Sequence, residues 1–388
     1  MELQVSSVNE ETVFSKLKKK RIQKLNGPDS PLYKVIWPFI YIARVFGFAP
    51  YNFSQDRIMP SNINLIFTMI AVIFYSYALY EVCVKFTNIK KDIPVLGQLE
   101  DVKVLINYSV VMYEVGLTMF TRNSFVRIWA ALQDYDESVR QLGYSRKETW
   151  TAIVAWFFVI VTTVIWIVIN RSGMYAFMES WFYNVRYMLP YLGTLVSVYK
   201  FVAVVMFLGQ RFRHLNAIAL QNLPPVTGRG TVTISKKTIL SLHNDLMIAA
   251  ENLGSLYSLS LLLWLGNLTL HTINSMYFII KWILINNWDR VTWPLTFCLS
   301  NWLFGFLLQL VLLHIACDFT SFQANCMGSI LIEWQVRVIK NEECIELLLQ
   351  FLNRKLQFSA GGCFYVNLPL LRSIASMMTT YLVILLQL

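Results

Sequence analysis

Residues 150–170 read WTAIVAWFFVIVTTVIWIVIN and contain no Asp, Glu, Lys or Arg. About 20 mostly apolar residues are enough for a helix to cross the hydrocarbon core of a bilayer. This stretch therefore predicts a membrane-spanning helix, and a chain with several such stretches is a polytopic membrane protein.

Further runs of this kind recur along the chain. Six are of spanning length and free or nearly free of charged residues: Ile63–Val84, Val102–Thr121, Val185–Leu208, Leu256–Ile285, Trp293–Ile315 and 368–388. We therefore predict an all-α polytopic membrane protein with seven transmembrane helices.

Residues 35–50 are also apolar, but Pro38, Arg44 and Gly47 interrupt this short run. We expect it to be a re-entrant or interfacial segment rather than an eighth span.

The composition supports the same class of protein. Hydrophobic residues make up 56% of the 388 residues and charged residues 14%, and the mean hydropathy is +0.50. An average soluble domain has about 45–50% apolar and about 25% charged residues. The chain has too few charges to cover the surface of a water-soluble enzyme of this length.

The 33 Lys and Arg residues are distributed unevenly between the two sides of the predicted bundle. With a cytosolic N-terminus, 23 of them fall in cytosolic segments and 8 in outer segments. Because Lys and Arg accumulate in cytosolic loops, we predict a cytosolic N-terminus and an extracellular C-terminus. The net charge of +10 is then explained by membrane topology and does not indicate a nucleic-acid partner.

The segments between the spans are predicted to lie mainly in the cytosol. Residues 1–34 form a basic tail, and 209–255 form a long loop with a helix from about Ser235. Apolar residues recur at helical spacing within 330–358. Because such a stripe must be buried against something, we predict that residues 316–366 form a cytosolic helical anchor.

The sequence lacks the patterns of catalytic and metal sites. Its four His and six Cys residues show no zinc-ligand spacing. Phosphate-loop, nucleophile-elbow and dinucleotide-binding signatures are absent as well. We expect neither an enzyme nor a bound cofactor or metal.

Two charged residues lie deep inside predicted spans, where charge is costly and points to function. Glu114 and Lys200 both lie roughly 18–22 Å from the outer end of their helices, at ~1.5 Å per residue. They either pair or share a water-filled cavity, or each makes separate polar contacts with neighbouring groups.

Aromatic and polar residues gather toward the outer half of the bundle. Tyr187 and Tyr191 begin the fourth span, and Trp264, His271 and Asn274 lie within the fifth. Aromatic walls with few polar groups are typical of a small-molecule pocket and also of an interfacial aromatic belt. We take these five residues and Glu114 as the candidate ligand site.

The last span has an ordered start and a polar stripe. Asn367 before Pro369 predicts a helix start, because Asn caps a helix and Pro fits its first turn. Thr380, Ile384 and Gln387 follow at spacings of four and three residues and so share one helix face. A Gln on this face is costly against lipid but suits a water-filled pore.

These last residues carry a resemblance to a known family. Thr380-Tyr381, five apolar residues and then Gln387-Leu388 resemble the TYhhhhhQF signature that ends insect gustatory receptors, with Leu in place of Phe. The resemblance implies a tetrameric, tastant-gated, non-selective cation channel in the plasma membrane of gustatory receptor neurons. It implies that the helices within 63–315 bind the tastant and that 367–388 line the pore. Gln387, Leu388, Ile384 and Thr380 would face the pore, with Gln387 and Leu388 at its constriction.

The resemblance also implies partners, and it leaves alternatives. The expected partners are a small-molecule tastant, permeant cations, membrane lipid and further subunits in a homotetramer or a heterotetramer with other gustatory receptors. A polytopic solute transporter and a co-receptor subunit that conducts only with partners are the alternative functions.

Overall fold

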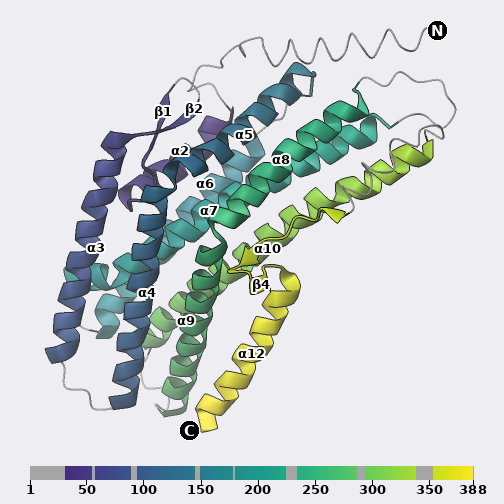
Figure 1. The fold of residues 1–388 in the computed structure, drawn as a ribbon. Helices are drawn as coiled ribbons and strands as arrows, with labels where there is room; N and C mark the ends of the chain where they lie inside the picture. The colour runs from purple at the N-terminus through teal and green to yellow at the C-terminus, as the bar shows by residue number, and fades with distance from the viewer. Residues whose placement is uncertain are drawn as a thin grey trace, which may run out of the picture.

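The computed structural model describes residues 31–54, 57–88, 94–144, 149–177, 180–223, 234–285, 293–337 and 353–387. Within these ranges the chain forms ten helices and two small antiparallel sheets (Figure 1). The helices are α2 (Pro31–Val45), α3 (Asn62–Asn88), α4 (Pro94–Phe120), α5 (Arg122–Gln141), α6 (Thr149–Phe177), α7 (Trp181–Gln221), α8 (Lys236–Leu256), α9 (Ser258–Ile285), α10 (Trp293–Arg337) and α12 (Leu368–Gln387). The strands are β1 (Tyr51–Ser54), β2 (Arg57–Pro60), β3 (Ser359–Ala360) and β4 (Phe364–Tyr365).

Each predicted span coincides with one of these helices. Five helices are long and apolar enough to cross a membrane, and up to seven spans result if each of two bent helix pairs is one span. The bends lie between α4 and α5, at 71°, and between α8 and α9, at 55°. The prediction of a mostly helical, multi-spanning membrane protein is confirmed.

Two helices extend well beyond the predicted ends of their spans. The helix α7 has 41 residues and α10 has 45, which corresponds to about 68 Å for α10 at ~1.5 Å per residue. The hydrocarbon core of a bilayer is only about 30 Å thick, so a large part of α10 must lie outside it. These extensions, α5 and α8 project to the end of the bundle opposite the C-terminal end of α12 (Figure 1).

The described residues 316–337 of the predicted anchor continue α10 toward this projecting end, whereas the hairpin β3–β4 within 353–366 packs against α9. The helix expected from about Ser235 is α8, and the Ser235 hydroxyl caps it by accepting a hydrogen bond from the backbone N–H of Thr238 at 3.2 Å. The helix α10 runs without a break across residue 316, where the anchor was predicted to begin. The tail 1–30 and most of the apolar stripe of the anchor, 338–352, lie outside the described residues.

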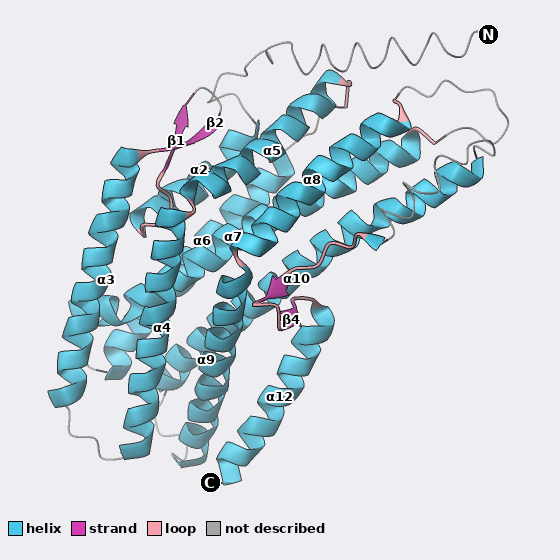
Figure 2. Ribbon diagram, in the orientation of Figure 1, coloured by secondary structure: helices cyan, strands magenta, loops and turns pink. Residues whose placement is uncertain are grey.

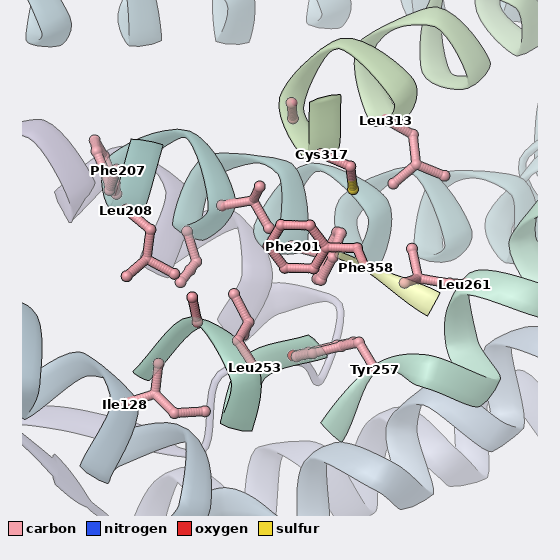
Figure 3. Packing of buried hydrophobic residues seen from close by; sticks show 14 of the residues in the cluster. Ile128, Phe201, Phe207, Leu208, Leu253, Tyr257, Leu261, Leu313, Cys317 and Phe358 are labelled. Carbon is pink, nitrogen blue, oxygen red and sulfur yellow. The ribbon is translucent and has the colours of Figure 1, made fainter. Parts of the chain in front are cut away.

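The helix α7 lies at the centre of the packing. It contacts α10, α4, α8, α3, α6 and α2. Phe201 of α7 lies 5.2 Å from Tyr257, at the bend between α8 and α9, and 6.1 Å from Phe358, measured between ring centroids (Figure 3). All three rings are buried, so one cluster joins α7 to the bend and to the segment that precedes α12.

Two short hairpins interrupt the otherwise helical chain (Figure 2). The strands β1 and β2 pair with Tyr51 opposite Pro60, and β3 and β4 pair with Ala360 opposite Phe364. Gly361 and Gly362 form the turn of the second hairpin with φ values of 60° and 75°, a conformation that glycine adopts without steric cost. The all-α prediction did not include these strands, because two to four residues are too few to give a periodic pattern.

The segment 35–50 is mostly helical. The helix α2 ends at Val45, and Gly47 then turns the chain with a φ of 83°. A Cβ atom at Gly47 would lie 2.6 Å from the Cβ of Ala71, so the turn allows α2 to approach α3 closely. The helix α2 packs against α6, α3 and α7, and its re-entrant or interfacial position in a membrane stays a prediction.

Candidate functional site

The polar residues of α4 face the interior of the bundle. Asn107 and Glu114 have no exposed surface, and Thr118 is buried as well. The side-chain oxygen Oδ1 of Asn107 accepts hydrogen bonds from Thr194 Oγ1 of α7 at 3.1 Å and from Asn267 Nδ2 of α9 at 2.9 Å. This polar contact joins three helices inside the bundle, where a polar group needs a partner.

Glu114 and Lys200 make separate contacts. The carboxylate oxygen Oε2 of Glu114 accepts a hydrogen bond from Ser197 Oγ at 2.7 Å. The ammonium group of Lys200 donates to the backbone carbonyl of Phe48 at 3.0 Å and to the Tyr51 hydroxyl at 3.5 Å. The hydrogen bonds of the two charges are therefore separate, and the charges also interact electrostatically.

Six rings from four helices pack together in what we call the aromatic cluster. Its members are Trp166 of α6, Tyr187 and Tyr191 of α7, His271 of α9, and Trp302 and Phe306 of α10. Tyr191 lies at the centre of the cluster, with ring centroids 4.7 Å from Trp302 and 5.1 Å from His271. The cluster therefore connects α7, α9 and α10 through one tyrosine.

His271 supplies a polar group to this cluster. Its ring stacks on Phe306 with centroids 4.9 Å apart and an angle of 19° between the planes. The residue is buried, and its Nε2 atom has no hydrogen-bond partner among the described residues. This nitrogen is therefore a polar atom that the cluster can offer to a hydrogen-bonding ligand.

The six predicted ligand-site residues divide into separate groups. Tyr187, Tyr191 and His271 meet in the aromatic cluster, and Asn274 is buried one turn further along α9. Trp264 lies instead beside Phe201, with ring centroids 5.6 Å apart. Glu114 belongs to the polar contacts between α4 and α7.

Three aromatic residues of the cluster were not predicted from the sequence. Trp302 and Phe306 are four residues apart and so share one face of α10, and Trp166 meets Trp302 at 5.0 Å in an edge-to-face contact. The spacing of Trp302 and Phe306 was a detectable signal. Which face of α10 meets α7 is decided only by packing.

The last helix is held at its start and exposed along most of its length. The Asn367 side chain accepts a hydrogen bond from the backbone N–H of Leu370 at 2.9 Å, which confirms the predicted cap. Ile374 and Met378 are buried in contacts of α12 with its neighbours α9 and α10. The predicted pore and signature residues Thr380, Tyr381, Ile384 and Gln387 are all exposed, and Leu388 lies outside the described residues.

These features define a helical, multi-spanning membrane protein with a buried polar and aromatic core and one exposed terminal helix. Residues 38–388 match the family described as 7tm chemosensory receptor. The chain belongs to this family of insect chemosensory receptors, which are not enzymes.

Solved structures share the fold. The insect olfactory receptor OR5 from Machilis hrabei matches with a TM-score of 0.65 and 14% sequence identity, covering 92% of this chain and 98% of that one. The same receptor in complex with eugenol matches with a TM-score of 0.64, the same identity and the same coverage. No curated protein sequence matches the chain. The agreement at this low identity shows that the fold is similar, over nearly the whole of both chains.

Proposed function

We propose that the chain is a subunit of a tastant-gated, non-selective cation channel. The observation that carries this proposal is the exposure of α12, of whose most apolar 18-residue stretch only 6% is buried. This helix presents Thr380, Ile384 and Gln387 on one exposed stripe. In a bilayer such a stripe is favourable when copies of the helix surround a water-filled pore.

The proposed gate lies at the end of α12. Gln387 amides from several subunits partly replace the hydration shell of a cation, and the apolar side chains of Ile384 and Leu388 close the pore by excluding water. A tetramer, formed by this chain alone or with other gustatory receptors, supplies four such helices. The plasma membrane of a gustatory neuron is the expected location.

The aromatic cluster is the proposed tastant site. It combines apolar ring faces with the buried Nε2 of His271, which is the usual chemistry of a small-molecule site. The fold is shared with a receptor whose structure was solved in complex with eugenol, which supports a small-molecule ligand. The signature Thr380-Tyr381 with Gln387 supports the gustatory assignment.

Patch-clamp recording from cells that express the chain tests the proposal. We expect a panel of tastants to evoke single-channel steps that conduct Na⁺, K⁺ and Ca²⁺. Gln387→Ala should change the permeability ratios, and His271→Ala should raise the tastant concentration needed for half-maximal current without changing those ratios. Trp181→Ala is the matched control, because Trp181 is half exposed and contacts Phe182 outside the cluster.

Saturable uptake of a solute without channel steps would contradict the proposal and identify a transporter. Current that appears only on co-expression with another receptor would keep the cation-channel proposal and select the heterotetramer, in which this chain conducts only with partners.

A further inference from the structure

A cavity of about 410 Å³ lies between α2, α5, α6 and α7. Apolar side chains form most of its wall, including Ala43 of α2, Trp129 of α5, Ile167 of α6 and Ala203 of α7. None of the six residues of the predicted ligand site lines it. The volume lies in the lower part of the range of about 300–1,000 Å³ that is usual for small-molecule sites.

The cavity opens on the side of the bundle that faces lipid. Thr163 and Ile167 of α6 line the cavity and are exposed, with 63% of Ile167 accessible. The helix α6 is a candidate membrane span of which only 17% of the most apolar stretch is buried. An exposed apolar span contacts lipid chains, so a molecule can enter this cavity from the bilayer.

The cavity is elongated along α7. Its lining residues on α7 run from Val185 to Phe207, a distance of about 33 Å along a helix. The lining residues of α6 run from Val159 to Asn170 and those of α2 from Phe39 to Ala43, so each of these helices covers part of this length. This shape fits one extended hydrocarbon chain better than a compact molecule.

Lys200 is the one charged residue among the described residues that line the cavity. Its ammonium group lies 4.5 Å from the ring centroid of Phe125, and its hydrogen-bond acceptors are the neutral oxygens of Phe48 and Tyr51. An ammonium group carries three donors, so one donor stays available beside these two bonds. The carboxylate of Glu114 acts on this ammonium group electrostatically but makes its own hydrogen bond to Ser197. A cation at this depth is costly, and the carboxylate of an anionic ligand would supply a counter-charge in direct contact with it.

We propose that this cavity binds a single-chain anionic amphiphile, a fatty acid, with its carboxylate on the Lys200 ammonium and its chain along α7 between α2 and α6. This inference does not depend on the proposed channel function. The two sites share only Trp166, which lines the cavity and contacts Trp302 of the aromatic cluster. A fatty acid bound here would therefore lie directly behind one wall of that cluster.

Photoaffinity labelling of the purified full-length chain in zwitterionic nanodiscs tests the proposal. The probe is a palmitic acid that carries a diazirine on its chain, and the labelled peptides are identified by mass spectrometry. We expect labels on peptides of α2, α6 and α7, and displacement by excess palmitate. Lys200→Met should lower the labelling about tenfold, because a hydrogen bond to a charged group is lost.

Two further variants keep the test decisive. Ala203→Trp fills the cavity while Lys200 stays in place, and it should also suppress labelling. Lys281→Met is the matched control, because Lys281 lies over the ring of Tyr277 on α9, outside the cavity. This control should label like the unaltered chain, and thermal unfolding of each variant separates loss of binding from loss of fold.

Competition experiments define the ligand. Palmitate should displace the probe far better than hexadecanol, which has the chain without the charge. Equal displacement by hexadecanol would overturn the role of Lys200. Equal displacement by a two-chain phosphatidate would overturn the single-chain ligand, and labelling that persists in Ala203→Trp would overturn the cavity itself.

Discussion

The helices α7 and α12 are both long and apolar, but their surroundings differ. Of the most apolar 18-residue stretch of each helix, 61% is buried in α7 and 6% in α12. The interior of the subunit is built around α7, which contacts most of the other helices. The helix α12 is attached to α9 and α10 by one face and by its capped start.

Because of this difference in burial, substitutions in α7 and in α12 are expected to affect different properties of the protein. Substitutions in α7 act on the fold of the subunit, because its side chains are enclosed by the same chain. Substitutions on the exposed face of α12 act on whatever that face meets in the membrane. Unfolding experiments on single subunits can therefore test the comparison independently of any measurement of current.

The largest loss of subunit stability is expected from a substitution beside the buried charge of α7. Arg211 is fully buried, and its Nη2 and Nε atoms donate to the Asp136 carboxylate of α5 at 2.7 and 3.2 Å. Asp136→Ala leaves this guanidinium without its carboxylate, which should cost about 3–5 kcal/mol of stability. A strongly lowered thermal midpoint of the detergent-solubilised chain would show this loss.

The double variant Asp136→Leu with Arg211→Met is the control for this pair. It removes both charges and should recover much of the stability. If Asp136→Ala unfolds at the same temperature as the unaltered chain, the central role of α7 is wrong at this position.

A smaller effect is expected where α7 meets α10. A Cβ atom at Gly209 would lie 2.5 Å from Thr320 Oγ1 and 2.8 Å from Phe319 Cδ1. Gly209→Ala should therefore cost about 1–3 kcal/mol, the usual cost of overpacking. Thermal unfolding of this variant can be compared directly with that of a second glycine in a helix.

Gly305→Ala on α10 is the matched control. A Cβ atom at Gly305 would meet nothing within 4 Å among the described residues. Replacing Gly by Ala in an open helical position should raise stability by about 0.4–1 kcal/mol. Equal destabilisation by both variants would show that close approach of α7 and α10 does not limit residue size at Gly209.

The smallest effect on subunit stability is expected on α12. Ile384 is 48% exposed, so Ile384→Ala should change the stability of an isolated subunit by less than about 0.5 kcal/mol. The same variant should alter the closed-state leak current if this face lines a pore. A large drop in the thermal midpoint of the isolated subunit would contradict the contrast between α12 and α7.

The sequence predicted the helices well because hydrophobic length is a local property. The run at 150–170 lies within α6, and over its described residues each of the six others lies almost entirely on a helix. The Asn367 cap lies where its spacing to Pro369 indicated. The lengths of α7 and α10 were underestimated. Hydropathy identifies the part of a helix that can contact lipid. Outside the membrane the same helix can continue with more polar residues, because neighbouring helices pack against it there.

The candidate site was predicted only in part. The charges of Glu114 and Lys200 marked them as unusual, but their partners Ser197 and Phe48 are separated from them by 83 and 152 residues. The sequence also assigned Trp264 and His271 of one helix to the same candidate ligand site, although they contact different aromatic groups. Helical periodicity finds residues on one face without showing what that face meets.

The sequence by itself determined the class of this protein, because spans, caps and charge bias are encoded within short stretches. It also carried the terminal signature that resembles insect gustatory receptors. Only the tertiary structure brought Trp166, Trp302 and Phe306 to Tyr191, and opened a cavity beside Lys200. These contacts and this cavity depend on how each helix is rotated about its axis relative to its neighbours. The packing of the whole bundle decides that rotation.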